Sequence, residues 1–106
     1  MYRLQYLPIV KQDMEENMSA RYQAYKDKVV IEELPLQIVR AAESLKKFPY
    51  IGVRVWPDIP LRREYRVLLV KKHMLFFTID EEEHTVTIAR LLYGWKKYEK
   101  ILQRDV

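Results

Sequence analysis

The sequence predicts an α+β domain in which an N-terminal strand and a helical hairpin precede a three- to four-stranded antiparallel sheet. Two observations lead to this prediction. Apolar residues recur at helical spacing between residues 9 and 47, and strand-like runs joined by tight turns fill residues 65–92. Strands linked by short turns pair as antiparallel neighbours, and their apolar face needs helices to cover it. With 106 residues, 49% of them hydrophobic, the chain is expected to form a single domain over residues 1–106.

The N-terminal segment alternates between apolar and polar side chains over residues 2–6, which is the period of a half-buried strand. Beyond Pro8, apolar side chains recur every fourth residue, at Val10, Met14, Met18 and Tyr22. This spacing places them on one face of a helix, which we expect over residues 9–25.

A second apolar stripe runs from Ile31 to Phe48 and fits one helix of about residues 28–47. Pro35 lies inside this stretch, where proline removes a backbone donor and clashes with the preceding turn. Either the helix is kinked at Pro35, or Pro35 starts the main helix and residues 28–34 form a separate turn.

The C-terminal half carries most of the expected sheet. Residues 49–64 contain three prolines and one glycine, which indicates a loop that holds a short strand near residues 53–56. Strand-like runs then follow at residues 65–70, 73–79 and 85–92. Only Lys71-Lys72 separates the first two, as in a tight hairpin, and a charged turn over residues 80–84 separates the second from the third.

The composition excludes several classes of protein. The chain has no cysteine, which excludes a disulfide framework, a thiolate nucleophile and a thiolate metal site. Its apolar runs are shorter than the ~20 residues that span a membrane, and the N-terminus shows no signal-peptide pattern. His73 and His84 have no third metal ligand beside them in the sequence. We therefore expect a cytoplasmic protein with no membrane partner, no cofactor and no metal.

The charge distribution indicates an anionic partner. Residues 1–61 carry nine Lys and Arg against eight Asp and Glu, whereas residues 62–106 carry ten against seven. The last strand stops at Gly94 and is followed by Trp95-Lys96-Lys97-Tyr98. Cations next to aromatic rings are typical of surfaces that bind nucleic acid.

The segments, in this order and at this spacing, resemble the RelE/ParE superfamily of bacterial toxin–antitoxin toxins. The resemblance covers nearly the whole chain. The segments that carry it are Leu7-Pro8, Ala41-Ala42-Glu43-Ser44-Leu45-Lys46-Lys47-Phe48-Pro49, Tyr65-Arg66, Leu75-Phe76-Phe77-Thr78-Ile79-Asp80-Glu81-Glu82 and Ile88-Ala89-Arg90-Leu91-Leu92-Tyr93-Gly94-Trp95-Lys96-Lys97-Tyr98.

The resemblance implies a toxin of a type II toxin–antitoxin system, neutralised by a cognate antitoxin protein. RelE-like members are ribosome-dependent mRNA endoribonucleases that need no metal, whereas ParE-like members inhibit DNA gyrase without cutting RNA. We expect the RelE-like activity on mRNA at the ribosome. Gyrase inhibition is the alternative, and an inactive or merely RNA-binding relative is a third reading. We also expect an antitoxin segment to fold over the sheet edge and the apolar groups of the first helix.

Four residues are the candidates for catalysis. Lys96 stands two residues after Gly94, where the resemblance implies a group acting on the leaving oxygen. Arg66 opens a strand at a position where the family often has a basic residue facing the cleft. Arg90 lies within an apolar strand and points either into a polar cleft or onto the open sheet face. Tyr98 lies near a family position whose aromatic side chain stacks on a base or assists proton transfer.

Each candidate also has a structural interpretation. Lys96 is then a solvated lysine, Arg66 is an exposed cross-strand partner of a glutamate, and Tyr98 packs with Ile101 and Leu102 under the sheet.

The candidates for binding nucleic acid surround the same glycine, and they are Tyr93, Trp95, Lys97 and Lys100. Two departures from the family pattern favour the gyrase alternative. Met74 stands where RelE-like nucleases usually carry an arginine, and Trp95 stands where many relatives have one.

Overall fold

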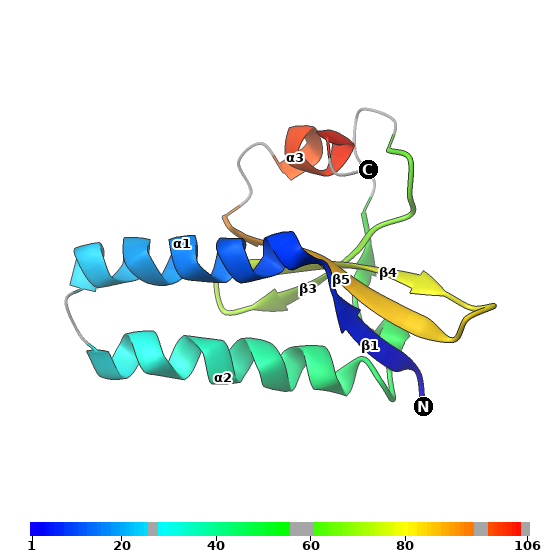
Figure 1. Cartoon of the computed structure of the whole chain (residues 1–106), viewed down its shortest axis with the longest axis horizontal. Helices are drawn as coiled ribbons and strands as arrows, with labels where there is room; N and C mark the ends of the chain where they lie inside the picture. The colour runs from blue at the N-terminus through cyan, green and yellow to red at the C-terminus, as the bar shows by residue number, and fades with distance from the viewer. Residues whose placement is uncertain (26–27, 56–60, 95–97, 105–106) are drawn as a thin grey trace.

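The computed structural model describes residues 1–25, 28–55, 61–94 and 98–104, with the backbone alone for residues 20–25, 28–32 and 99. Its elements, in chain order, are β1 (Arg3–Tyr6), α1 (Pro8–Tyr25), α2 (Lys28–Ser44), the 3-10 helix η1 (Pro49–Ile51), β2 (Val53–Arg54), β3 (Arg66–Val70), β4 (His73–Asp80), β5 (Thr85–Tyr93) and α3 (Tyr98–Arg104). The order of strand, helix pair and hairpin-linked strands confirms the predicted α+β class (Figure 1).

The five strands form one mixed sheet in the order β1-β5-β4-β3-β2. The four strands from β2 to β5 pair antiparallel, as predicted. β1 pairs in parallel with β5, with Arg3 opposite Thr85 and Tyr6 opposite Ile88. Two long helices and three strands separate β1 from β5 in the chain, so the connection is long enough for a parallel pair.

The helices α1 and α2 lie side by side and cover one face of the sheet (Figure 1). Between helices and sheet lies an apolar cluster whose fully buried members include Ile38, Leu45, Phe77 and Ile88. α2 runs continuously through Pro35, so the interpretation with a separate turn over residues 28–34 is wrong. Within the described ranges, neither helix nor any other is long and apolar enough to cross a bilayer.

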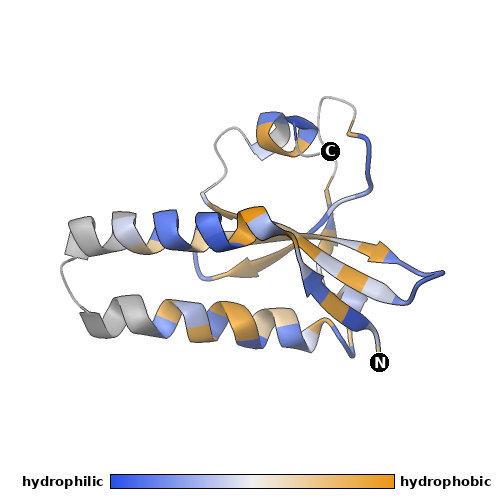
Figure 2. Ribbon diagram, in the orientation of Figure 1, coloured by the Kyte–Doolittle hydropathy of each residue, from blue (hydrophilic) through white to orange (hydrophobic). Residues whose placement is uncertain are grey.

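The strands send alternate side chains to two faces, and Figure 2 shows the resulting alternation of apolar and polar residues. Phe77 belongs to the cluster under the helices, whereas its neighbour Phe76 belongs to a second cluster on the opposite side. We call this opposite side the open face. The short helix α3, which the sequence pattern does not predict, packs on it through Leu102, whose side chain is buried.

Candidate functional site

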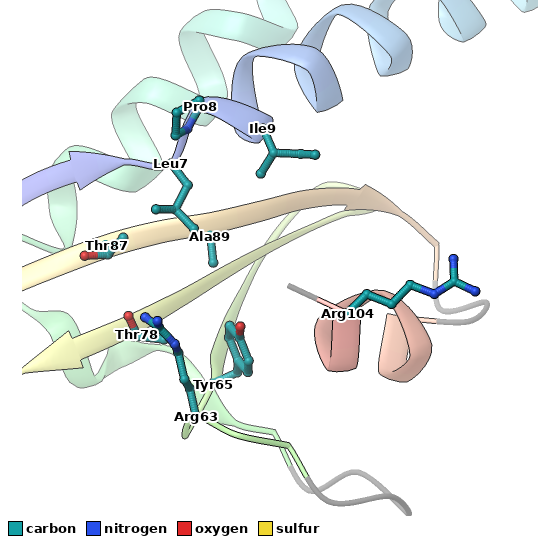
Figure 3. A pocket seen from close by; sticks show the side chains of 9 residues that line it. All are labelled: Leu7, Pro8, Ile9, Arg63, Tyr65, Thr78, Thr87, Ala89 and Arg104. Carbon is teal, nitrogen blue, oxygen red and sulfur yellow. The ribbon is translucent and has the colours of Figure 1, made fainter. Parts of the chain in front are cut away.

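The open face carries a hollow of about 370 Å³ over β4 and β5 (Figure 3). We call it the basic hollow. Its wall comes from the start of α1, from the segment before β3 and from α3. The lining residues are Leu7, Pro8, Ile9, Arg63, Tyr65, Thr78, Thr87, Ala89 and Arg104.

A line of three polar side chains begins on the floor of the basic hollow, with two threonines, and continues outside its lining to Gln5. Thr78 on β4 stands directly opposite Thr87 on β5, and Thr87 stands opposite Gln5 on β1. The amide Nε2 of Gln5 donates a hydrogen bond of 2.8 Å to Thr87 Oγ1. We call these three residues the polar row. They give the open face hydrogen-bonding groups in the middle of three paired strands.

The two arginines of the basic hollow are placed differently. The side chain of Arg63 extends over the sheet toward Thr78, whereas the guanidinium of Arg104 points away from the polar row (Figure 3). Tyr65 lies between them and points into the hollow, with only 3% of its surface exposed. Arg63 is therefore the cation best placed to meet a ligand on the polar row.

A register shift in the sheet makes room for the hollow. Phe77 pairs with Ile88 and Phe76 pairs with Arg90, which leaves Ala89 as an extra residue in β5. Such a bulge changes the direction of the side chains that follow it. The small Ala89 faces the basic hollow, and Arg90 turns toward α1.

A second hollow, of about 440 Å³, lies on the open face nearer to β2. We call it the apolar hollow, because its lining is almost entirely apolar. The lining residues are Ile51, Val53, Arg54, Val55, Val67, Leu68, Leu69, Met74, Phe76 and Tyr98. Met74, which replaces an arginine expected in RelE-like nucleases, is buried here at 1% exposure.

Arg90 connects the sheet to the helices. Its Nε and Nη2 donate hydrogen bonds of 2.8 and 2.7 Å to the two carboxylate oxygens of Asp13 on α1. Asp13 Oδ2 also accepts a hydrogen bond of 3.0 Å from the backbone N–H of Leu91. The side chains are only 14% and 4% exposed. Arg90 thus lies neither in a polar cleft nor on the open face, and its catalytic role stays a prediction.

Arg66 is also directed away from the open face. It shares the helix-covered side with Leu68, and its Nη2 donates a hydrogen bond of 2.6 Å to the carbonyl oxygen of Gly52. Its guanidinium carbon lies 5.1 Å from the centre of the Tyr50 ring. The structure therefore separates Arg66 from the basic hollow, and the expected cross-strand glutamate pair is replaced by a backbone and ring contact.

The remaining described candidates lie at the end of β5 and on α3. Tyr98 stacks on Phe76, with ring centres 5.6 Å apart, and lines the apolar hollow. Tyr93 is exposed, and its ring lies 5.2 Å from that of the buried His73. Lys100 is exposed on α3. Trp95, Lys96 and Lys97 lie outside the described residues, so their roles stay predictions.

Sequence reasoning missed Arg63, Tyr65 as a lining residue, Thr78 and Thr87. One signal was present in the strand alternation, because Tyr65 and Val67 share a face that excludes Arg66. Thr78 and Thr87 are polar positions inside two largely apolar strands, and polar residues on such strands indicate an open or functional face.

A separate group of polar side chains joins the other end of the sheet. Glu81, in the turn after β4, accepts hydrogen bonds from the hydroxyl groups of Tyr2 and Tyr50. The bond to Glu81 raises the pKa of Tyr50 to about 12, and the same bond is the main cause that lowers the pKa of Glu81. Tyr2 also stacks on His84 with ring centres 3.8 Å apart. The group links β1, η1 and the β4–β5 turn.

No protein-family model and no curated protein matches this chain. Among solved structures, the chain is similar to a chain of the RelBE2 toxin–antitoxin complex from Mycobacterium tuberculosis, with a TM-score of 0.58 and 15% sequence identity. The match covers 87% of this chain and 90% of the other. The chain has a RelE-type toxin fold.

The resemblance read from the sequence is thus confirmed at the level of the fold. The match extends over most of the chain. At 15% identity the match carries no side-chain roles, so the assignment of the site rests on the geometry of this chain.

Proposed function

We propose that this protein is the toxin of a type II toxin–antitoxin pair and that it cleaves mRNA at the ribosome. The observation that carries the proposal is the basic hollow on the open face of a RelE-type fold, with Arg63 directed over the polar row (Figure 3). In this reaction the ribose 2′-hydroxyl attacks the adjacent phosphate, and the protein supplies positioning, proton transfer and charge.

The residues of the hollow fit those tasks. The planar guanidinium of Arg63 suits a phosphate, whose negative charge increases as the phosphorane forms. The Tyr65 hydroxyl is a proton-transfer group within the same hollow. Lys96 and Lys97 follow β5 in the sequence; Lys96 stays the candidate for charge on the leaving-group side, and Lys97 stays a candidate for binding the nucleic acid.

The proposed cleavage is tested with ribosomes programmed with a defined mRNA, to which the purified protein is added, followed by mapping of the new 5′ ends. We expect cleavage by the wild type and a loss of about 100-fold in rate for Arg63→Ala, the range seen when one charge-stabilising donor is removed.

The neighbouring Arg62 provides a matched control, because it has the same charge, is also exposed and does not line the hollow. Arg62→Ala is expected to stay within about threefold of the wild type, as for a charge that acts only through the overall field. Intact message at stoichiometric amounts of wild-type protein would overturn the proposal.

Met74 favours a second candidate function, inhibition of DNA gyrase. Met74 stands at the position where RelE-like nucleases usually carry an arginine, and it lines the apolar hollow. An apolar hollow fits a protein partner better than a phosphate. The measurement is gyrase supercoiling and trapping of the cleavage complex. Unchanged supercoiling at micromolar protein would remove this candidate.

An antitoxin segment is the proposed protein partner. Among the described side chains of α1 there is no exposed large apolar group. The described part of α1 therefore does not offer the apolar contact that we expected an antitoxin segment to cover. Exposed apolar side chains instead gather around the β2 edge, at Phe48, Tyr50, Ile51, Val53 and Leu69. An unpaired strand edge beside apolar groups accepts an added strand from a partner. We therefore place the antitoxin along β2.

A further inference from the structure

We infer that the basic hollow is a subsite for one nucleobase, whose polar edge is read by the hydroxyl groups of Thr78 and Thr87. The inference rests on the proposed function, because the base is taken to belong to the bound mRNA. It adds a selection step to the proposed cleavage, since the base that fits would determine where the message is cut.

The lining of the hollow matches a base better than a bare phosphate. One side is apolar, with Leu7 just before α1, Pro8 and Ile9 at the start of α1, and Ala89 from β5. A phosphate needs cations and donors but gains nothing from an apolar wall, whereas a base has two flat apolar faces and a polar edge.

The size of the hollow also points to a single base. Its volume of about 370 Å³ lies at the lower end of the range for small-molecule pockets, which is roughly 300–1,000 Å³. The floor is rigid, because Thr78 and Thr87 stand opposite each other on paired strands and Gln5, on a third strand outside the lining, is hydrogen-bonded to Thr87. A rigid floor fixes hydrogen-bonding groups well enough to discriminate between ligands.

The polar groups favour bases that present acceptors. Arg63 is left for the phosphate of the same nucleotide, so the hydroxyl groups of the two threonines face the base. Thr87 Oγ1 already accepts a hydrogen bond from Gln5, which leaves its hydroxyl proton to be donated. Guanine and uracil present carbonyl oxygens where adenine and cytosine present amino groups. The subsite is therefore assigned to a keto base.

The inference is tested with the full-length protein and free nucleotides, without ribosomes. GMP, UMP, AMP, CMP and ribose 5-phosphate are titrated separately while the NMR signals of Thr78, Thr87 and Ala89 are followed. We expect GMP and UMP to bind about tenfold more tightly than AMP and CMP, and ribose 5-phosphate to bind most weakly, in line with the discrimination of one well-placed pair.

The hydroxyl of Thr78 is tested by a pair of variants. Thr78→Val removes the hydroxyl and keeps the branched shape, and it should reduce the preference for keto bases to about threefold or less. Thr78→Ser keeps the hydroxyl and should keep the preference. The same change should appear in the bases found at mapped mRNA cleavage sites.

The outcomes separate the subsite from the cleavage activity. If ribose 5-phosphate binds as tightly as GMP, the hollow holds only a phosphate and the inference is overturned. It is also overturned by unchanged signals of the hollow at millimolar nucleotide, or by an undiminished keto preference in Thr78→Val. Keto-selective binding by a protein that leaves mRNA intact would support the subsite and overturn the proposed nuclease activity.

Discussion

The two faces of the sheet are built from the same strands but are closed to different degrees. On the helix-covered face, Ile38, Leu45, Phe77 and Ile88 are fully buried in one continuous cluster. On the open face, Phe76 is equally buried, yet this face also carries hollows of about 370 and 440 Å³. The first face supplies stability, and the second combines a smaller apolar core with space for a ligand.

The arginines of the two faces show the same division. Arg90 forms a two-point ion pair with Asp13 under α1, and Arg66 binds the backbone next to η1. Arg63 instead extends over the polar row on the open face (Figure 3). The face that a side chain occupies therefore separates arginines that hold the fold from an arginine that can meet a ligand.

The largest expected effect is a loss of stability when the ion pair on the helix-covered face is broken. Asp13→Ala leaves the guanidinium of Arg90 in a site where it is only 14% exposed, and removes the acceptor of the Leu91 N–H. Removing one partner of a buried ion pair costs about 3–5 kcal/mol. Urea denaturation followed by circular dichroism measures the change in the free energy of unfolding.

Glu15→Ala is the matched control, because Glu15 lies on the same helix and is exposed. It should change the free energy of unfolding by less than about 0.5 kcal/mol. A double variant, Asp13→Leu with Arg90→Met, should recover much of the loss, because it removes both charges together. Equal effects of Asp13→Ala and Glu15→Ala would show that the ion pair does not stabilise the fold.

The strands are the part of the fold that the sequence predicts best. Short turns such as Lys71-Lys72 leave only one way to pair β3 with β4, so the antiparallel register follows from local information. The parallel pairing of β1 with β5 depends on contacts across most of the chain. α3 is one short helix held by Leu102 against the sheet, so its own pattern is too weak to predict it.

The site is less predictable, because both faces of this sheet bury apolar side chains. Alternation shows that Arg66 shares a face with Leu68 and Val70 and that Tyr65 shares the other with Val67. It does not show which face the helices cover. The direction of Arg90 further depends on the register shift before it, which no local pattern reveals.

A smaller loss of stability is expected at Gly52, where the backbone lies close to a buried side chain of the helix-covered face. A Cβ at Gly52 would lie 2.7 Å from Phe77 Cζ and 2.9 Å from the carbonyl oxygen of Val67. Gly52→Ala should therefore reduce the free energy of unfolding by about 1–3 kcal/mol, the usual cost of overpacking. Thermal or urea denaturation measures this change.

Gly94 provides the contrast to Gly52, because its constraint is the backbone conformation and not close packing. A Cβ there would meet no described atom within 4 Å, and its φ is +78°. Gly94→Ala should cost about 1–2 kcal/mol through backbone strain alone. Asparagine tolerates this φ, so Gly94→Asn should recover part of the loss, whereas Gly52→Asn should be worse than Gly52→Ala. Recovery by asparagine at Gly52 would contradict the packing argument.

The smallest expected effect concerns the hydrogen bonds of Glu81, which join β1, η1 and the β4–β5 turn. The hydroxyl groups of Tyr50 and Tyr2 lower the pKa of Glu81 below its ordinary value of 4.5. A carboxyl group with a lowered pKa stabilises the folded state fully above about pH 4.5, and this contribution disappears as the pH falls through the lower folded value. The melting temperature of the wild type should therefore fall on acidification below that pH.

Glu81→Gln should flatten this acid-side fall, whereas Glu82→Gln, an exposed neighbour in the same turn, should leave it unchanged.

The contribution of Tyr50 to stability has the opposite dependence on pH. The raised pKa of Tyr50, about 12, gives a contribution that is complete below pH 10 and is lost as the pH rises through about 12. In a titration followed by phenolate absorbance, Tyr50→Phe should show one tyrosine fewer than the wild type ionising near pH 12. Because the hydrogen bonds that Glu81 accepts from Tyr2 and Tyr50 are exposed, the acid-side and alkaline changes in stability should both be small beside the loss caused by Asp13→Ala. If the melting temperature of Glu81→Gln falls on acidification as much as that of the wild type, Glu81 is excluded as the cause of the fall.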